Sequence, residues 1–152
     1  MRPYETDPSA IYAASFATVA REARLDRFAE PMRPLITRLI HSCGMIEIAD
    51  RLAFSPAVAF AGHHALQSGA PVLCDCEMVG AGIIRRYLPA GNDVIVTLND
   101  PSVPGRAKSI GNTRSAAAVE LWRDHIEGAV VAIGNAPTAL FHLLELLDAG
   151  WP

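Results

Sequence analysis

The 152-residue sequence has few charged residues, few cysteines and no long apolar run. Only 19% of the residues are charged while 51% are hydrophobic, so the composition excludes an intrinsically disordered chain. No apolar run approaches the length of a membrane-spanning helix, and the N-terminal segment has no basic-plus-apolar leader. The net charge of −3 gives no indication of a nucleic-acid partner. We therefore expect one globular domain, residues 1–152, that binds neither nucleic acid nor membrane.

The three cysteines are too few, and odd in number, for a disulfide framework. Reduced thiols fit better, which favours a cytoplasmic protein. His63 and His64 are adjacent in the sequence, so on a helix their side chains diverge and do not converge on one ion. We expect no metal site.

Several catalytic and cofactor motifs are also missing from the sequence. There is no Walker loop and no nucleophile elbow. Gly80-Ala81-Gly82 begins like a dinucleotide fingerprint, but Arg85 stands where the third glycine should be. The segment also does not open from a strand into a helix. These absences disfavour a generic α/β hydrolase or a nucleotide enzyme.

The segment 128–150 carries the strongest pattern in the chain. Its residues 129–133 form a short apolar run rich in β-branched side chains, which predicts a strand buried on both faces. A Gly-Asn turn and Pro137 then predict a mostly buried helix that ends at Gly150, with one polar stripe at His142, Glu145 and Asp148. The crevice beyond the carboxyl end of such a strand is where open α/β sheets bind ligands.

The rest of the chain alternates helical and extended patterns. We expect helices from Asp7-Pro8, from Pro31 to about 41–44, from Ser55-Pro56 to Gly69, a short one after Asp100-Pro101, and one over 114–123, with strands at 71–73 and 93–98. This alternation predicts an α/β fold with a mostly parallel sheet.

Polar residues in helical positions are the candidates for a binding site. Arg38 and His41 are three residues apart, so they share a helix face. Ser15 lies at the edge of the inward-facing stripe predicted for the first helix, whose members are Ile11, Tyr12, Phe16, Val19, Ala20 and Ala23. Arg114 begins a helix, where an arginine is disfavoured unless an anionic ligand is shared between its guanidinium and the free N–H groups. Ordinary alternatives stay open. The arginines could be solvated, the histidine could bind a carbonyl, and the serine could bond back to its own helix.

Long stretches of the sequence resemble the precorrin-8X methylmutase family, also called precorrin isomerase, with its cobalt-precorrin-8 counterpart. The matching stretches, in family order, are YETDPSAIYAASFATV, RLIHSCGM, LAFSP, GAPVLCDCEMV, LPAGNDVIVTLNDP, GNTRSAAAVELW and GAVVAIGNAPTALFHLLELL. They cover nearly the whole chain. The resemblance implies a three-layer α/β/α fold, a tetrapyrrole substrate held near the interface of a homodimer, and no separate cofactor.

The activity implied by this resemblance is an intramolecular methyl transfer from C11 to C12 of precorrin-8X, giving hydrogenobyrinic acid or its cobalt analogue. The family's proton donor/acceptor corresponds to His41. Ser15 and Arg38 match residues that hold the substrate, and Arg114 falls beside the pocket. A non-catalytic corrinoid carrier derived from the family is the alternative.

Two departures from the family pattern are visible. Members often have a Thr-Arg pair where this chain has Ile84-Arg85, so one polar substrate contact is expected to be missing. The family also continues beyond the position of Pro152 with a further strand and a glycine-rich segment. We therefore expect this chain to be a form of the domain shortened at its C-terminus.

Overall fold

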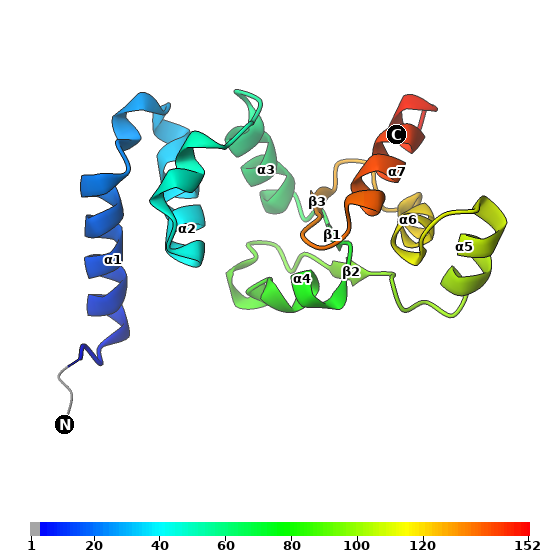
Figure 1. Ribbon diagram of the computed structural model, residues 1–152, viewed down its shortest axis with the longest axis horizontal. Coiled ribbons are helices and arrows are strands. Elements are labelled where there is room, and N and C mark those ends of the chain that lie inside the picture. The colour runs from blue at the N-terminus through cyan, green and yellow to red at the C-terminus, as the bar shows by residue number, and fades with distance from the viewer. Residues whose placement is uncertain (1–3) are drawn as a thin grey trace. The chain divides into compact units, whose positions relative to one another are not determined.

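The computed structural model describes residues 4–152, which divide into two compact units (Figure 1). The first unit extends to Ala61 and the second covers Gly62–Pro152. Each unit is described by itself below. The single domain expected for residues 1–152 stays a prediction.

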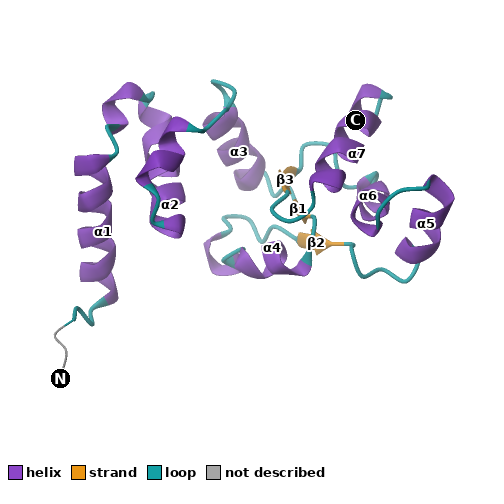
Figure 2. Cartoon of the chain, viewed as in Figure 1, coloured by secondary structure: helices purple, strands orange, loops and turns teal. Residues whose placement is uncertain are grey.

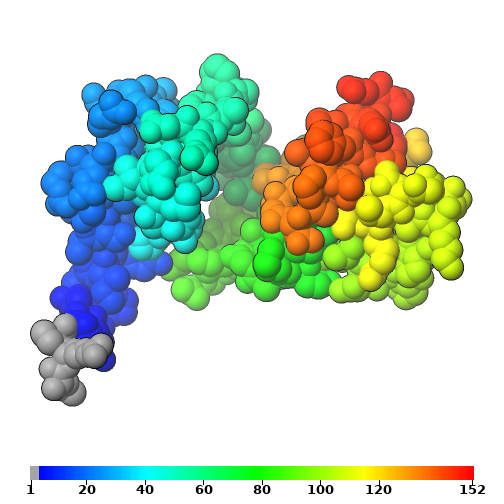
Figure 3. Space-filling model, viewed as in Figure 1, coloured from blue at the N-terminus to red at the C-terminus, as the bar shows by residue number. Residues whose placement is uncertain are grey.

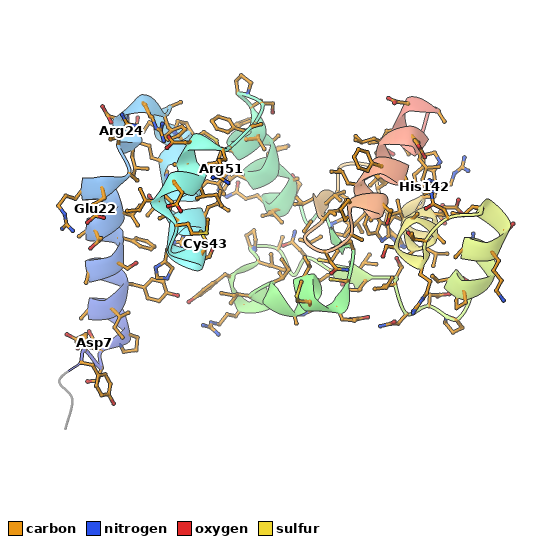
Figure 4. The ribbon with its side chains drawn as sticks, in the orientation of Figure 1. Asp7, Glu22, Arg24, Cys43, Arg51 and His142 are labelled. Atoms are coloured by element: carbon orange, nitrogen blue, oxygen red, sulfur yellow. The ribbon has the colours of Figure 1, made fainter. Side chains whose placement is uncertain are left out.

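The first unit is built from two α-helices and three short 3₁₀ turns. Its elements are α1 (Pro8–Glu22), η1 (Leu25–Arg27), η2 (Glu30–Met32), α2 (Arg33–Cys43) and η3 (Ile46–Asp50). The predicted starts and stops are confirmed, because Asp7 caps α1 by accepting from Ala10 N–H at 2.9 Å and Gly44 ends α2 with a φ of 70°. Figure 4 labels Asp7 at the start of α1 and Cys43 at the end of α2.

The core of the first unit lies between α1 and α2, whose atoms pack against each other in Figure 3. Its buried members are Val19, Ala23, Met32, Ile36, Ile40 and Ala49. The inward stripe predicted for α1 is therefore only partly right. Val19 and Ala23 are buried, but Ile11 and Tyr12 near the start of the helix are exposed.

The second unit contains a three-stranded parallel sheet, drawn in orange in Figure 2. The strands are β1 (Val72–Cys74), β2 (Val94–Val96) and β3 (Val130–Ala132), in the order β2-β1-β3. The prediction that the strand at 129–133 is buried on both faces is wrong. The central strand is β1, all of whose residues are buried, whereas β3 has one neighbouring strand and is half-buried.

Helices cover both faces of this sheet, which confirms the α/β fold with a parallel sheet. Leu73, Ile95 and Val131 are aligned in register at the middle of the three strands. All three join the apolar cluster formed by α6 (Arg114–Val119) and α7 (Pro137–Asp148). On β2, Val94 and Val96 alternate with Ile95 and lie against Gly80 of α4 (Glu77–Gly82). The second unit therefore has an α/β/α layering.

Helix α4 was missed by the sequence analysis, which expected no strand-to-helix opening near Gly80-Ala81-Gly82. The helix begins at Glu77, two residues after β1, and these glycines form its last turn. They do not lie in a loop at a helix N-terminus. Their position at the end of a helix is a second reason, besides Arg85, to reject a dinucleotide fingerprint.

The remaining helices of the second unit follow the predicted positions. They are α5 (Val103–Ile110), α6 (Arg114–Val119), η5 (Glu120–Trp122) and α7 (Pro137–Asp148), and α3 (Val58–Gln67) spans the boundary between the units. The 3₁₀ turn η4 (Arg85–Tyr87) is also present and was not predicted. Helix α7 is less buried than expected. Ala139 and Leu143 are its buried residues, while Leu140, Phe141, Leu144 and Leu147 are exposed.

Two general expectations can be compared with the described residues. The cysteines are unpaired, with Cys43 exposed and Cys74 and Cys76 buried, and burial raises the pKa of the Cys74 thiol. No helix within residues 4–152 is long and apolar enough to cross a membrane.

Candidate functional site

A hydrogen bond joins Ser15 of α1 to His41 of α2, two of the residues singled out in the sequence. Ser15 Oγ lies 2.7 Å from His41 Nδ1, although the residues are 26 positions apart. Both side chains are partly buried. Two ordinary alternatives are therefore wrong. The serine bonds to the histidine and not back to its own helix, and the histidine bonds to a hydroxyl group and not to a carbonyl.

Two aromatic rings of α1 surround the His41 imidazole. The ring of Tyr12 lies 4.9 Å from the imidazole, centroid to centroid, with an interplanar angle of 31°. Phe16 meets the imidazole edge-on at 5.4 Å and 83°, and it also contacts Tyr12 at 5.8 Å. Because Ser15 and Phe16 follow Tyr12 by three and four residues, one side of α1 presents all three to His41.

Arg38 reaches the same group of residues through Phe16. Its guanidinium carbon lies 5.6 Å from the centre of the Phe16 ring, a cation–π distance. Arg38 is exposed, so its charged end is also accessible to a ligand. Arg38 and His41 therefore both contact Phe16, and Ser15, which precedes Phe16 in the chain, is hydrogen-bonded to His41.

A pocket of about 430 Å³ opens beside this cluster. Ser15 and His41 line it together with the residues Ala14, Thr18, Val19, Glu22, Ile40, Gly44 and Ile46. The lining is mostly apolar, with a few polar groups placed among apolar ones, which is typical of small-molecule sites.

The Ser15–His41 pair can take part in proton transfer in both directions. In the imidazolium form, Nδ1–H donates to Oγ and the second ring proton, on Nε2, can be given to a ligand. In the neutral form that results, Nδ1–H still donates to Oγ and Nε2 is left as an acceptor. Within residues 4–152, no protein group forms a hydrogen bond with Nε2, so this atom is available to a ligand.

Arg114 belongs to the second unit and has protein partners. Its Nη2 donates to Leu98 O and to Asn99 Oδ1, both at 3.2 Å. The N-terminus of α6 is capped by Thr113, whose Oγ1 accepts from Ala116 N–H. The predicted sharing of an anion between this arginine and free N–H groups therefore has no support in the structure, which shows a solvent-exposed arginine that braces the loop after β2.

The turn after β3, where a ligand crevice is predicted, is bound by a side chain from the end of β1. Asp75 is buried directly after β1, and its carboxylate accepts from the N–H groups of Gly134, Asn135 and Ala136 at 2.8–3.2 Å. These donors would otherwise be the natural anion contacts of the turn. These three N–H groups are therefore bonded to a protein carboxylate, and the ligand crevice at this strand end stays a prediction.

The structure reveals site features that sequence reasoning missed. Tyr12 and Phe16 were interpreted as core residues, although their spacing from Ser15 already placed them on one helix side. A second pocket, of about 690 Å³, lies in the second unit and is lined in part by Ile84 and Arg85, where the family pattern differs. Within residues 4–152, no cluster of three His, Cys, Asp or Glu side chains is placed to hold a metal ion.

Comparisons with known proteins agree with this description. The family model of precorrin-8X methylmutase matches residues 10–152. A precorrin-8X methylmutase of Pseudomonas aeruginosa is 54% identical over 152 residues, which is 100% of this chain and 73% of the relative. A cobalt-precorrin-8 methylmutase of Priestia megaterium is 30% identical over 150 residues, 98% of this chain and 67% of the relative.

Solved structures give the same result. The crystal structure of a precorrin-8X methylmutase from Thermus thermophilus superposes with a TM-score of 0.83 at 36% identity, covering 94% of this chain and 70% of that one. Fold and sequence together define the class of protein as an isomerase of the methylmutase type. Within this class, the chain belongs to the precorrin-8X methylmutase family of cobalamin biosynthesis.

Proposed function

We propose that this protein converts precorrin-8X into hydrogenobyrinic acid by moving a methyl group from C11 to C12, with His41 as the proton donor and acceptor. The observation that carries the proposal is the 2.7 Å contact between Ser15 Oγ and His41 Nδ1, at a pocket where Nε2 has no protein partner within the described residues. The chain is 54% identical to the precorrin-8X methylmutase of P. aeruginosa and 30% identical to the cobalt-precorrin-8 methylmutase of P. megaterium. The higher identity to the first enzyme supports a metal-free substrate.

The proposed chemistry needs a proton to be added and then removed. Protonation of the macrocycle at or near ring C weakens the bond between C11 and the methyl group, which migrates to C12. Loss of a proton completes the reaction, so substrate and product are isomers. A histidine is suited to both steps near neutral pH, and Ser15 can accompany either step because its hydroxyl group both donates and accepts.

The substrate carries acetate and propionate groups around an apolar ring. We propose that Ser15 and Arg38 hold it beside His41 and that Arg114 contributes a further cation. The exposed guanidinium of Arg38, braced on Phe16, supports this role because it combines a charge with a defined position. For Arg114 the support is the family resemblance, and binding requires the side chain to exchange its contacts with Leu98 O and Asn99 for a substrate carboxylate.

We propose that the protein acts as a homodimer. Several apolar side chains of the first unit are exposed, among them Ile11, Leu35, Leu39, Met45 and Phe54, which supports association. Sedimentation of the purified chain should give twice the monomer mass. A stable monomer with full activity would contradict this part of the proposal.

The role of His41 is tested by His41→Asn, because asparagine is similar in size and retains hydrogen-bonding capacity. Turnover of precorrin-8X, followed by absorption, should fall roughly 10²–10⁴-fold, while the thermal melt and the affinity for hydrogenobyrinic acid change little. His63→Asn, at an exposed histidine of α3, is the matched control and should retain the wild-type rate. A folded His41→Asn protein that isomerises precorrin-8X at the wild-type rate would overturn the assignment.

A further inference from the structure

Tyr12 is a half-exposed aromatic residue next to the proposed catalytic histidine. Its side chain retains 49% of its accessible surface, so burial in the core of the first unit does not explain its position. Its ring contacts within residues 4–152 are with Phe16 and with His41, and the contact with His41 is the closer of the two.

The hydrogen bond from Ser15 does not by itself fix the direction of His41 Nε2. It holds Nδ1 at 2.7 Å from the hydroxyl oxygen, but the second side-chain torsion of histidine is broad. The imidazole plane can therefore turn while the hydrogen bond persists, and Nε2 moves with it. Phe16 meets the imidazole at 83°, so its edge touches the ring without defining the plane.

The Tyr12 ring supplies the missing restraint. Because it lies over the imidazole at 4.9 Å and is tilted by only 31°, rotation of the imidazole plane would drive the two rings into each other. Tyr12 and Ser15 are three residues apart on α1, so a single helical turn controls both the position and the plane of His41.

We propose that Tyr12 is a positioning residue for the methylmutase reaction, whose ring holds the His41 imidazole in the plane that directs Nε2 at the substrate. This role rests on the proposed function of His41. It requires the flat ring and not the phenolic hydroxyl group.

The experiment compares the kinetics of Tyr12→Leu, Tyr12→Met and Tyr12→Phe with the wild type on precorrin-8X. The leucine and methionine variants should lose roughly tenfold in kcat with little change in KM, since small misplacement of a catalytic group is costly in rate. The phenylalanine variant should keep the wild-type kcat because the ring remains. Phe141→Leu is the matched control, because it removes an exposed aromatic side chain from α7 and should leave the kinetics unchanged.

A double-mutant cycle shows whether Tyr12 acts through His41. In the His41→Asn background, Tyr12→Leu should cause no further loss of kcat. NMR relaxation of the His41 ring C–H groups gives a readout that does not depend on turnover. In Tyr12→Leu the relaxation should show a more mobile imidazole, and in Tyr12→Phe it should stay at the wild-type values.

The possible failures are distinct. Three results would each overturn the positioning role while His41 keeps its function. The folded leucine and methionine variants could keep the wild-type kcat, the phenylalanine variant could be as slow as the leucine variant, or the losses in kcat could multiply in the double-mutant cycle. If His41→Asn itself turns over at the wild-type rate, the proposed function fails and this role fails with it.

Discussion

The carboxylate of Asp75 accepts a hydrogen bond from the backbone N–H of Ala136 at 2.8 Å, across 61 positions of the sequence. The same oxygen accepts from Asn135, and the other carboxylate oxygen accepts from Gly134. This buried side chain thus connects the end of the central strand β1 with the start of α7. It performs the role of a helix cap for a helix whose own N-cap residue, Ala136, has no side-chain acceptor.

Asp75→Asn should therefore destabilise the protein. An amide has one acceptor oxygen in place of two, so at least one of these part-buried N–H groups loses its partner, at a cost of about 1–3 kcal/mol. Urea unfolding should show a lower midpoint with an unchanged slope. Asp93→Asn, at an exposed aspartate just before β2, is the control and should unfold like the wild type. Equal stability of the two variants would show that the carboxylate is not needed.

The packing of α4 on β2 predicts opposite effects for two glycines of one helix. A Cβ at Gly80 would lie 2.7 Å from Val96 Cγ2, whereas at Gly82 nothing lies within 4 Å. Gly80→Ala should lower stability by about 1–3 kcal/mol through overpacking, despite the better helix propensity of alanine. Gly82→Ala should be neutral or slightly stabilising. Thermal melts of both variants are the measurement, and a Gly80→Ala protein as stable as Gly82→Ala would contradict the close approach.

Electrostatic binding of the product should depend on salt. Because Arg38 is exposed, its pairing with a carboxylate is screened, and the affinity for hydrogenobyrinic acid should fall as salt increases. Arg38→Ala should weaken binding at low salt by about 1 kcal/mol, roughly fivefold in Kd, and reduce the salt dependence. Arg114→Ala should act in the same direction. Arg51→Ala, at an exposed arginine labelled in Figure 4, serves as control. Affinity that is independent of salt would count against both arginine contacts.

Asp100, at the turn before α5, should titrate below an ordinary aspartate. Hydrogen bonds from the side chain and then the backbone N–H of Ser102 lower the pKa of this carboxyl, because they favour the ionised form. Its contribution to stability is thus present above the pKa of the unfolded chain and is lost as pH falls through the lower pKa of the folded protein. Carbon NMR should follow the Asp100 carboxyl, with Ser102→Ala moving its pKa upward. An unchanged pKa in Ser102→Ala would contradict the cause.

Local patterns in the sequence were enough to predict the three strands and all of the α-helices except α4. The reason is that the signals are local: Asp7-Pro8 supplies an N-cap and a first turn, Gly44 supplies a left-handed stop, and Pro137 starts α7. The long motifs also indicated the family, which the family model and the relatives confirm. The same motifs selected Ser15, Arg38 and His41, which the fold gathers around Phe16.

Only the tertiary structure decided how these segments are used. Strand order depends on hydrogen bonds between distant residues, so the sequence pattern favoured 129–133 as the buried strand whereas pairing places β1 in the centre. The plane of the His41 ring depends on Tyr12, which is 29 positions away and which hydropathy alone assigned to the core. The direction of the Arg114 side chain was likewise set by the loop after β2, because a guanidinium group binds whichever acceptors the folded chain brings within reach.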